Sequence, residues 1–153
     1  MHVSLRPATA QDCDFLWWLH CHTIRPYVEQ LWGWDEAWQR QYFREHFRPE
    51  KTEIVEADGA PAGCLRVERR QDHIFLSLIQ IAPQHQNQGV GTKLIESLIV
   101  EGDRHNMPVR LSVLQTNDLA RRLYERLGFV VVQETDERIY MERRASTERG
   151  GGA

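Results

Sequence analysis

The sequence predicts one mixed α/β domain, with a mostly antiparallel sheet of about seven strands and flanking helices. Two strand-like runs separated by the dipeptide Asp58-Gly59 predict an antiparallel hairpin. Strand-like runs at 73–81 and 109–114 enclose a helical stretch, and such a β-α-β unit pairs its strands in parallel. A further helix and two short strands complete the pattern. The length of 153 residues fits a single domain.

The N-terminal part begins with a short strand at 3–6. Thr9-Ala10-Gln11-Asp12 has the form of a capping box, which predicts the start of a helix. This helix should be interrupted at Arg25-Pro26, because proline lacks an amide donor and biases the residue before it away from helix. Aromatic residues recurring on neighbouring turns predict a second helix over 35–47.

Three strands are expected in the middle of the chain. The hairpin consists of runs at 52–57 and 63–69 around the Asp58-Gly59 turn. The run at 73–81 is apolar on both faces near its end, as expected of an inner strand of a covered sheet. Pro83 ends this strand.

The C-terminal half contains the most regular patterns. An apolar stripe predicts a helix over 89–105, and the strand at 109–114 follows it. A helix starting near residue 118 ends at Gly128, a residue type that readily adopts the left-handed conformation after a helix. Strands at 129–133 and 139–142 follow. The predicted domain therefore covers 1–143, and the glycine-containing tail 144–153 is expected to be disordered.

Composition limits the classes of partner and the location. A net charge of −3 and a pI near 6.2 give no general reason to expect nucleic-acid binding. No apolar run approaches the ~20 residues that cross a bilayer, and the first residues do not resemble a signal peptide, so we expect a cytoplasmic protein without a membrane partner. The cysteines Cys13, Cys21 and Cys64 are spread along the chain and predict neither a disulfide framework nor a metal site.

A polar loop between the third strand and the long helix carries the main functional pattern. It contains the sequence Gln86-Asn87-Gln88-Gly89-Val90-Gly91 and enters the helix directly. Glycine lets the backbone approach an anion closely, and the first N–H groups of the helix are directed at that anion. The alternative interpretation is a solvated loop and helix cap. No Lys-Ser/Thr pair follows, and a third glycine is missing, so neither a Walker loop nor a dinucleotide fingerprint is indicated.

Two motifs resemble those of the GNAT superfamily of N-acetyltransferases. Residues 86–91 fit its Q/R-x-x-G-x-G/A signature, and residues 117–129 are similar to its N-x-x-A-x-x-x-Y-x-x-x-G-F block. The resemblance covers roughly residues 3–142, but the first seventy match only in the order of elements. It implies a GNAT-like fold whose splayed parallel strands admit the arm of acetyl-CoA. It also implies direct attack by a neutral amine on the acetyl group.

The resemblance assigns cofactor-binding roles to a set of loop, strand and helix residues. These are Gln80, Ile81, Ala82, Gln86, Asn87, Gln88, Gly89, Val90, Gly91, Thr92, Asn117 and Tyr124. The backbone of 80–82 would bind the pantetheine arm and polarise the thioester carbonyl. Asn117 could cap its helix, contact the arm, or do both.

Two side chains are predicted to be catalytic. By resemblance, the Tyr124 phenol would donate to the departing CoA thiolate, although a tyrosine on an apolar helix face is also typical of a core. The strand at 73–81 has no glutamate, where some family members place a base. Glu29 is therefore the candidate amine binder or base, and a surface or capping role is its alternative. Deprotonation through water needs no single base.

The acceptor side is less defined by the sequence. The five tryptophans, Trp17, Trp18, Trp32, Trp34 and Trp38, all lie within the first 38 residues and favour either an aromatic pocket or helix packing. The run His20-Cys21-His22 lacks metal-ligand spacing, so no metal is expected.

The predicted function is transfer of an acetyl group from acetyl-CoA to a primary amine of a small molecule or peptide. The alternatives are an enzyme acting on protein N-termini or lysines, and a non-catalytic CoA-binding regulatory module. Retention of Tyr124 favours an enzyme. The chain could act as a monomer or a homodimer.

Overall fold

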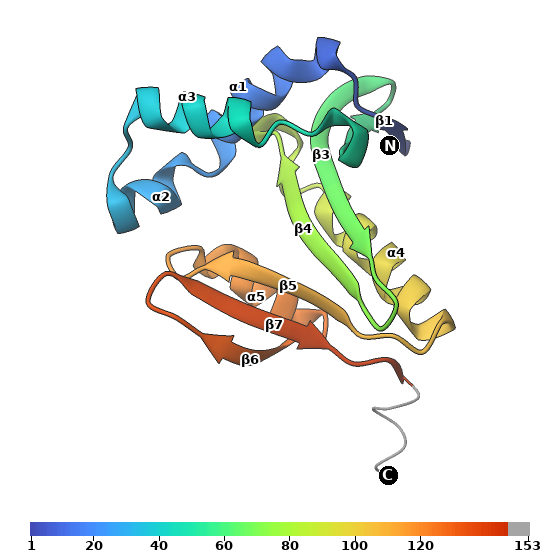
Figure 1. Ribbon diagram of the computed structural model, residues 1–153. Helices are drawn as coiled ribbons and strands as arrows, with labels where there is room; N and C mark the ends of the chain where they lie inside the picture. The colour runs from blue at the N-terminus through green and yellow to red at the C-terminus, as the bar shows by residue number, and fades with distance from the viewer. Residues whose placement is uncertain (147–153) are drawn as a thin grey trace. The chain divides into compact units, whose positions relative to one another are not determined.

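The computed structural model describes residues 1–146 of the chain (Figure 1). Its elements are β1 (Val3–Pro7), η1 (Ala10–Asp12), α1 (Cys13–Thr23), α2 (Arg25–Trp32), α3 (Glu36–Glu45), η2 (Pro49–Lys51), β2 (Glu53–Ala57), β3 (Ala60–Arg69), β4 (Ile74–Ile81), η3 (Pro83–His85), α4 (Val90–Arg104), β5 (Val109–Leu114), α5 (Asp118–Arg126), β6 (Val130–Glu134) and β7 (Arg138–Arg143). The three η elements are short 3-10 helices.

The described residues contain one sheet of seven strands, in the order β1-β2-β3-β4-β5-β7-β6. β4 and β5 pair in parallel, and β1 with β2, β2 with β3, β5 with β7 and β6 with β7 pair antiparallel. This confirms the predicted mixed α/β fold with a mostly antiparallel sheet and one parallel pair.

The chain divides into two compact units. Unit 1 consists of Met1–Arg66 and Leu78–Val90, and unit 2 of Val67–Ser77 and Gly91–Ala153. The strands β3 and β4 therefore contribute residues to both units.

The hairpin of unit 1 forms around the predicted turn. Asp58 and Gly59 have φ angles of 52° and 84°, the left-handed conformations that a tight two-residue hairpin turn requires. β3 starts at Ala60, earlier than the predicted start at 63, and Pro61 lies opposite Glu56. A bulge at Val55/Glu56 explains the difference, because a bulge tolerates a proline inside a strand.

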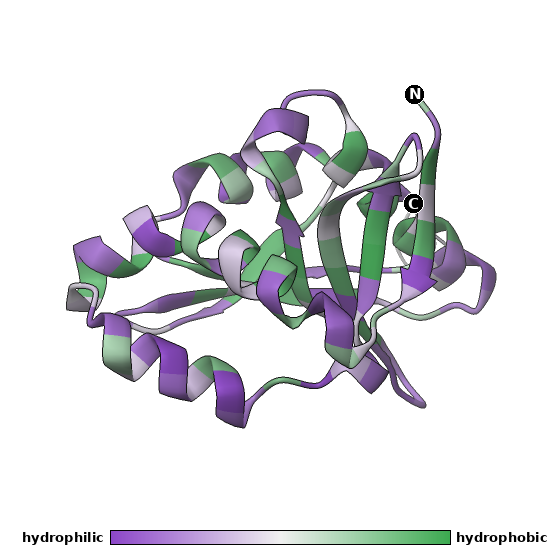
Figure 2. Cartoon of the chain, turned by 90° about the horizontal axis from the view of Figure 1, so that it is seen from above, coloured by the Kyte–Doolittle hydropathy of each residue, from purple (hydrophilic) through white to green (hydrophobic). Residues whose placement is uncertain are grey.

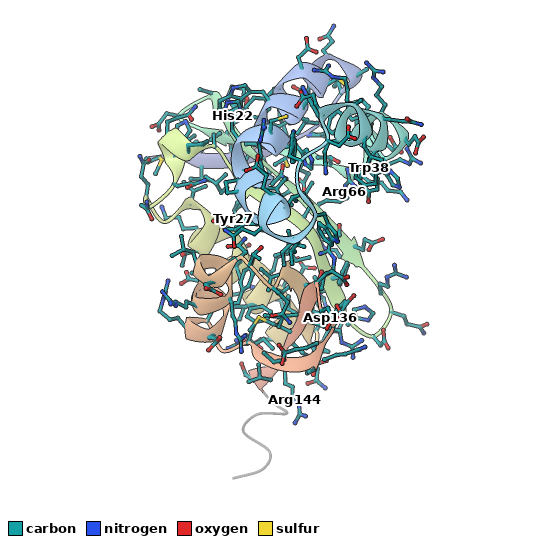
Figure 3. The ribbon with its side chains drawn as sticks, turned by 90° about the vertical axis from the view of Figure 1, so that its left-hand side faces the viewer. His22, Tyr27, Trp38, Arg66, Asp136 and Arg144 are labelled. Carbon is teal, nitrogen blue, oxygen red and sulfur yellow. The ribbon has the colours of Figure 1, made fainter. Side chains whose placement is uncertain are left out.

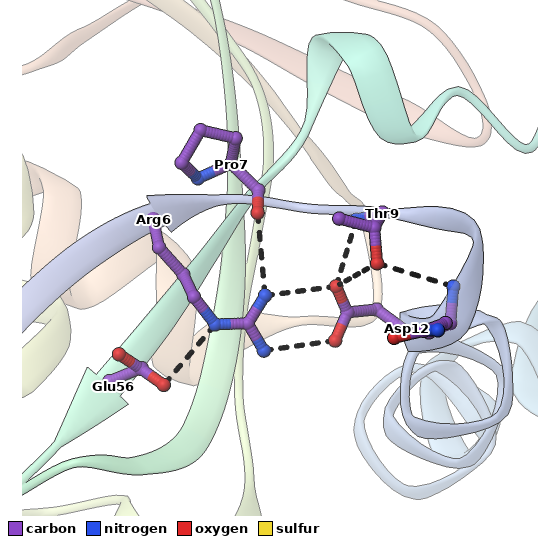
Figure 4. Close-up of polar contacts among 6 residues, drawn as sticks. Arg6, Pro7, Thr9, Asp12 and Glu56 are labelled. Carbon is purple, nitrogen blue, oxygen red and sulfur yellow. Dashed lines mark hydrogen bonds and ion pairs between the residues drawn. The ribbon is translucent and has the colours of Figure 1, made fainter.

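The predicted capping box is present at the start of η1, the 3-10 helix that leads directly into α1. The Thr9 hydroxyl accepts from the Gln11 amide at 3.3 Å, and Asp12 accepts from the Thr9 amide at 2.8 Å. Arg6 binds both carboxylate oxygens of Asp12, at 2.9 and 3.0 Å, and also Glu56 at 3.2 Å (Figure 4). This network joins β1 and β2 to the residues that start α1.

The helix α2 was not predicted from the sequence. The interruption expected at Arg25-Pro26 is present, because α1 ends at Thr23, but a new helix begins at Arg25. Pro26 lies in the first turn of α2, where its missing amide donor is not needed. Gly33, with φ of 76°, ends the helix.

The core of unit 1 joins its helices to its strands. The buried residues of this cluster are Ala8, Leu16, Leu19, Ile54, Cys64 and Ala82, with Phe15, Phe43, Phe47 and Leu78 packed against them. The cluster therefore brings α1 and α3 against the end of β4. Hydrophobic and hydrophilic residues alternate along the helices (Figure 2), as amphipathic helices require.

In unit 2, β5 lies between β4 and β7. Its parallel pairing with β4 joins Ile74, Phe75 and Leu76 to residues 109–111, and its antiparallel pairing with β7 covers all of β5. The bounds of β5 agree with the prediction, and α4 is one residue shorter at each end than predicted. The predicted apolar stripe of α4 is buried: Val90, Leu94, Ile95, Leu98 and Ile99.

The chain remains in contact with unit 2 just beyond β7. Ala145 is buried, and the Ser146 amide donates to Asp103 at 2.8 Å. The predicted tail, 144–153, thus begins within the described part, and its residues 147–153 lie outside the described residues.

Candidate functional site

The end of β4 is held closely against β3. A Cβ on Gly63 would collide with the carbonyl oxygen of Gln80 and would lie 3.1 Å from Cδ1 of Ile81. The Ala82 amide donates to the Ala62 carbonyl at 2.8 Å. Gly63 therefore allows the close approach of residues 80–82, the backbone that the sequence predicts to bind acetyl-CoA. It was missed as a site residue, although a glycine inside a strand pattern signals such close approach.

The three predicted residues at this strand end, 80–82, have different surroundings. The buried Gln80 side chain accepts from the Cys64 thiol at 3.7 Å, and burial raises the pKa of that thiol to about 12. The Ile81 carbonyl accepts from the Gln86 side chain at 2.9 Å. Because successive strand residues direct their backbone groups to opposite edges, the Ile81 amide is directed away from β3, unlike that of Ala82.

The loop before α4 has the geometry of a tight polar turn. Asn87 and Gly89 have φ angles of 62° and 81°, and asparagine and glycine are the residue types that adopt these values most easily. The Gln88 side chain donates to the Gln84 carbonyl at 3.1 Å. With the bond from Gln86 to Ile81, two side-chain amides stabilise the loop.

The donors at the start of α4 suit an anion. Helix geometry leaves the N–H groups of residues 89–92 without an intrahelical acceptor, and the helix dipole adds positive potential there. No carboxylate occurs between Ile81 and Lys93. The chemistry of this donor set therefore fits a pyrophosphate group, and the structure places residues 86–92 in one continuous turn and helix start.

The second motif corresponds to the two ends of α5. The Asn117 side chain accepts from the Ala120 amide at 3.2 Å, so Asn117 caps the helix as one alternative expected. At the other end, the Phe129 amide donates to the Tyr124 carbonyl and the Gly128 amide to the Glu125 carbonyl, at 3.0 and 3.1 Å. This pair of bonds is a Schellman motif.

The Schellman motif explains the spacing of Tyr124, Gly128 and Phe129. Gly128 has φ of 94°, which suits glycine, and the rings of Tyr124 and Phe129 lie 5.9 Å apart. A contact between these two positions commonly accompanies the motif. Gly128 and Phe129 therefore set the exit of the helix, as expected, and the Tyr124 ring takes part in this packing.

The hydroxyl of Tyr124 is its chemically available part. The residue is 7% exposed, and burial raises its pKa to about 12. Within residues 1–146 the hydroxyl has no hydrogen-bond partner, and no fully buried side-chain oxygen or nitrogen lacks one. The oxygen is therefore not fully buried, and its raised pKa keeps it a protonated donor at neutral pH.

Glu29 lies on an exposed face of α2. Its carboxylate pairs with Arg25 one turn earlier, with 2.6 Å between Oε1 and Nε. The side chain is 46% exposed. This contact is typical of a surface ion pair, and a cationic ligand would have to compete with Arg25 for the carboxylate.

The five tryptophans fall into two groups. Trp18, Trp32 and Trp38 are exposed, with exposed fractions of 37%, 57% and 57%. Trp17 and Trp34 are half-buried, and both contact the ring of His20, with centroids 5.9 and 5.8 Å away. None of the five belongs to the fully buried core of the described chain.

Two further properties concern residues 1–146 as a whole. No cluster of three or more His, Cys, Asp or Glu side chains there has an arrangement that could hold a metal ion. In the same residues, no helix combines the length and apolar character that crossing a bilayer requires.

Comparison with known proteins gives consistent matches. The family model described as "Acetyltransferase (GNAT) family" matches residues 13–129. A "5-NmdU N-acetyltransferase" of Pseudomonas phage PaMx11 is 34% identical over 84 residues, which are 54% of this chain and 59% of that protein. The "N-alpha-acetyltransferase 40" of Saccharomyces cerevisiae is 33% identical over 95 residues, 57% of this chain and 31% of that protein. The chain thus spans less than two thirds of either relative.

Solved structures share the fold at low sequence identity. The PaiA N-acetyltransferase from Thermoplasma acidophilum, in complex with coenzyme A, matches with a TM-score of 0.75 and 17% identity, covering 94% of this chain and 99% of that one. The apo form of YjaB from Escherichia coli matches with a TM-score of 0.73 and 16% identity, covering 95% and 100%.

Proposed function

Because the chain belongs to the acetyltransferase (GNAT) family, we propose that it transfers the acetyl group of acetyl-CoA to a primary amine. The observation that carries this proposal is the turn before α4. Asn87 and Gly89 adopt left-handed conformations there, and the first N–H groups of the helix, at residues 89–92, have no intrahelical acceptor. The sequence between Ile81 and Lys93 contains no carboxylate. A pyrophosphate is the part of acetyl-CoA that such donors would bind.

The end of β4 would act on the acetyl group. Acetyl-CoA supplies a thioester, and attack by a neutral amine builds negative charge on the thioester oxygen. We assign the Ile81 amide as the donor to that oxygen, because it is directed away from β3, whereas the Ala82 amide is bonded to Ala62. Gly63 keeps this backbone in place through its close contact with Gln80.

Tyr124 would stabilise the leaving thiolate by a hydrogen bond. A phenol with a pKa of about 12 is a weaker acid than a thiol, whose reference pKa is about 8.5. The phenol therefore keeps its proton when it donates to the thiolate, and the thiolate is protonated later from another source. This assignment rests on the accessible hydroxyl and on the second motif.

The acceptor would be a primary amine of a small molecule or a peptide. The curated relatives are named as an N-acetyltransferase of 5-NmdU and an N-alpha-acetyltransferase, so both names describe transfer to nitrogen. Glu29 remains the candidate that attracts a cationic acceptor, since its exposed carboxylate can exchange Arg25 for an ammonium group.

A screen of amines and peptides with acetyl-CoA, read as release of free thiol, tests the activity.

Gly91→Glu tests the binding site, because a carboxylate among the N–H groups of residues 89–92 would repel the pyrophosphate. We expect acetyl-CoA affinity, measured by calorimetry, to fall at least ~100-fold. Ser97→Glu, which adds the same charge at an exposed position of α4, is the control and should bind as the parent does. A folded Gly91→Glu protein with parental affinity would refute the assigned site.

A further inference from the structure

His20 lies near the end of α1 among aromatic rings from two other parts of unit 1. Its ring centroid is 5.9 Å from Trp17, 5.8 Å from Trp34 and 6.3 Å from Phe43. Trp17 belongs to α1, Trp34 to the segment before α3, and Phe43 to α3. The imidazole is therefore oriented by packing from three directions.

The tautomer of His20 follows from its one hydrogen bond. Nε2 lies 3.1 Å from Oε1 of Gln39, one of the few buried polar residues of the described chain. An amide oxygen can only accept, so Nε2 carries the proton and Nδ1 holds a lone pair. Within residues 1–146, Nδ1 has no partner, and it is not fully buried, because no fully buried side-chain nitrogen lacks a partner.

Two other histidines of unit 1, His22 in α1 and His46 directly after α3, differ in this respect. Nδ1 of His22 lies 2.8 Å from the Trp18 carbonyl, and Nδ1 of His46 lies 2.9 Å from the Tyr42 carbonyl. A carbonyl oxygen requires a proton on the nitrogen that faces it, so Nδ1 of both residues is a donor. Only His20, among these three, has Nδ1 available as a proton acceptor.

The charges around His20 do not favour an imidazolium. Burial lowers its pKa, and the hydrogen bond to Gln39 opposes this only in part. The guanidinium groups of Arg25 and Arg40 lie over the neighbouring Trp34 and Trp17 rings, at 5.2 and 4.8 Å.

The carboxylates nearby have partners of their own. Glu36 accepts from the Trp34 indole at 2.9 Å and pairs with Arg40 at 3.7 Å, while Glu29 pairs with Arg25. Cys21, next to His20, has its thiol pKa raised by burial. Among the described residues no carboxylate binds the imidazole, so its surroundings favour the neutral ring over the imidazolium.

The packing of unit 1 brings this turn of α1 to the end of β4. Leu19, which precedes His20, belongs to the buried cluster that contains Ala82, and Leu78 packs against the same cluster. Phe43, whose ring contacts His20, also packs against it. The same hydrophobic cluster therefore supports both His20 and the backbone assigned to the thioester.

We propose that Nδ1 of His20 accepts the proton that the acceptor amine loses during acetyl transfer. The amine nitrogen bonds to the acetyl carbon, the C–S bond breaks, its electron pair stays on sulfur, and the amine proton passes to Nδ1. Gln39 is a positioning residue, because its carbonyl keeps the proton on Nε2. This inference rests on the proposed function and supplies a base in a chain whose β4 has no glutamate.

NMR titration of the histidine-labelled full chain tests the tautomer without any acceptor. We expect His20 to be protonated only on Nε2 at pH 7 and to titrate below its reference pKa of about 6.5. Gln39→Leu should remove this preference and populate the Nδ1–H form. A proton on Nδ1 of His20 in the parent would overturn the proposal.

Kinetics with glycinamide as the probe amine test the role. His20→Gln should lower kcat about 100-fold and remove the part of the rise of kcat/KM with pH that follows the titration of His20, while the part that follows deprotonation of glycinamide stays. Calorimetry should show unchanged acetyl-CoA affinity. Gln39→Leu should lower kcat with KM unchanged. The control is His22→Gln (His22 is labelled in Figure 3), which should behave as the parent does.

The outcomes separate the two proposals. A folded His20→Gln protein with parental kcat and an unchanged pH profile would refute the role of His20 alone. A parent chain that fails to bind acetyl-CoA, or that binds it and acetylates no amine in the screen, would instead refute the proposed function. In that case, the NMR result still decides whether His20 has the tautomer inferred from Gln39.

Discussion

The Tyr124 side chain combines a buried ring with an accessible hydroxyl, so its two parts can be tested separately. Tyr124→Phe removes the hydroxyl and keeps the ring contact with Phe129. If the phenol stabilises the leaving thiolate, kcat should fall roughly 10- to 1000-fold with acetyl-CoA affinity unchanged. Steady-state kinetics and calorimetry provide these two readouts. Parental turnover in the variant would show that Tyr124 only packs.

The same substitution should also change how the free energy of unfolding depends on pH above pH ~10. Burial raises the pKa of Tyr124 to about 12, above the reference value of about 10 for an unfolded chain. The folded state therefore holds its phenol proton more tightly, and this contribution to stability is full below pH ~10 and is lost as the pH rises toward 12. Tyr124→Phe should lose less stability over this window than the parent in denaturant titrations.

Glu29 can be tested by kinetics with little effect on folding, because its carboxylate forms only an exposed ion pair with Arg25 in the described structure. The pair with Arg25 is exposed, so Glu29→Gln should change the free energy of unfolding by no more than ~0.5 kcal/mol. If Glu29 attracts a cationic acceptor, the acceptor KM should rise up to roughly fivefold, with acetyl-CoA binding intact.

The control for Glu29 is Asp35→Asn. Asp35 caps α3 by accepting from the Trp38 amide at 3.0 Å, and asparagine can keep this bond. This variant should leave the acceptor KM unchanged. An acceptor KM that is equal in Glu29→Gln and in the parent between pH ~6 and 9 would identify Glu29 as a surface residue only.

At the scale of elements, the sequence predicted best where local chemistry alone decides the outcome. The helix α5 has an asparagine at its start and Gly128-Phe129 after its end, so its caps could be inferred before its packing was known. The turn Asp58-Gly59 likewise needs only residues that tolerate positive φ.

The elements that were missed depend on tertiary context. Pro26 correctly indicated a break, but its place in the first turn of a new helix depends on α1 ending at Thr23. Pro61 was expected outside a strand, and a bulge at Val55/Glu56 admits it.

The same limit applies to the site. The loop at 86–92 carries its chemistry in backbone groups and glycines, which a local motif specifies. The role of Gly63 depends on how closely β4 approaches, and the inference about His20 depends on the contact with Gln39, 19 positions away. Neither contact has a local sequence pattern.

At the scale of the whole molecule, each unit contains an arginine that joins separate elements through carboxylates. In unit 1, Arg6 binds Asp12 and Glu56. In unit 2, Arg143 donates to the Leu127 carbonyl at 3.0 Å and pairs with Asp103 at 3.4 Å. These bonds connect elements that are far apart in the sequence. Protonation of the carboxylates in them should therefore affect the cooperative unfolding of the chain.

Protonation of the carboxylates in both networks should destabilise the fold in acid. The hydrogen bond from the Arg6 guanidinium lowers the pKa of Asp12. Burial acts in the opposite direction, and the hydrogen bond from the Thr9 amide lowers this pKa further. At Asp103, burial alone would raise the pKa, but the hydrogen bonds from Ser146 and Arg143 together lower it. A carboxylate with a lowered folded pKa stabilises the protein above its unfolded value of about 3.9, and this contribution disappears as the pH falls below it.

Asp12→Asn isolates this contribution in unit 1. Asparagine can still accept from the Thr9 amide but cannot form a bidentate ion pair with Arg6. We expect the variant to be less stable than the parent by about 1 to 2 kcal/mol at pH ~7, since the pair is charged and only partly exposed. Asp14→Asn, two residues later at an exposed position in the first turn of α1, should cost no more than the ~0.5 kcal/mol that a carboxylate contributes at a helix start. Urea unfolding at several pH values should show the difference between parent and Asp12→Asn disappearing between pH ~4 and ~2. A difference that stays constant down to pH ~2 would mean that shape, and not the charge of Asp12, stabilises this corner of unit 1.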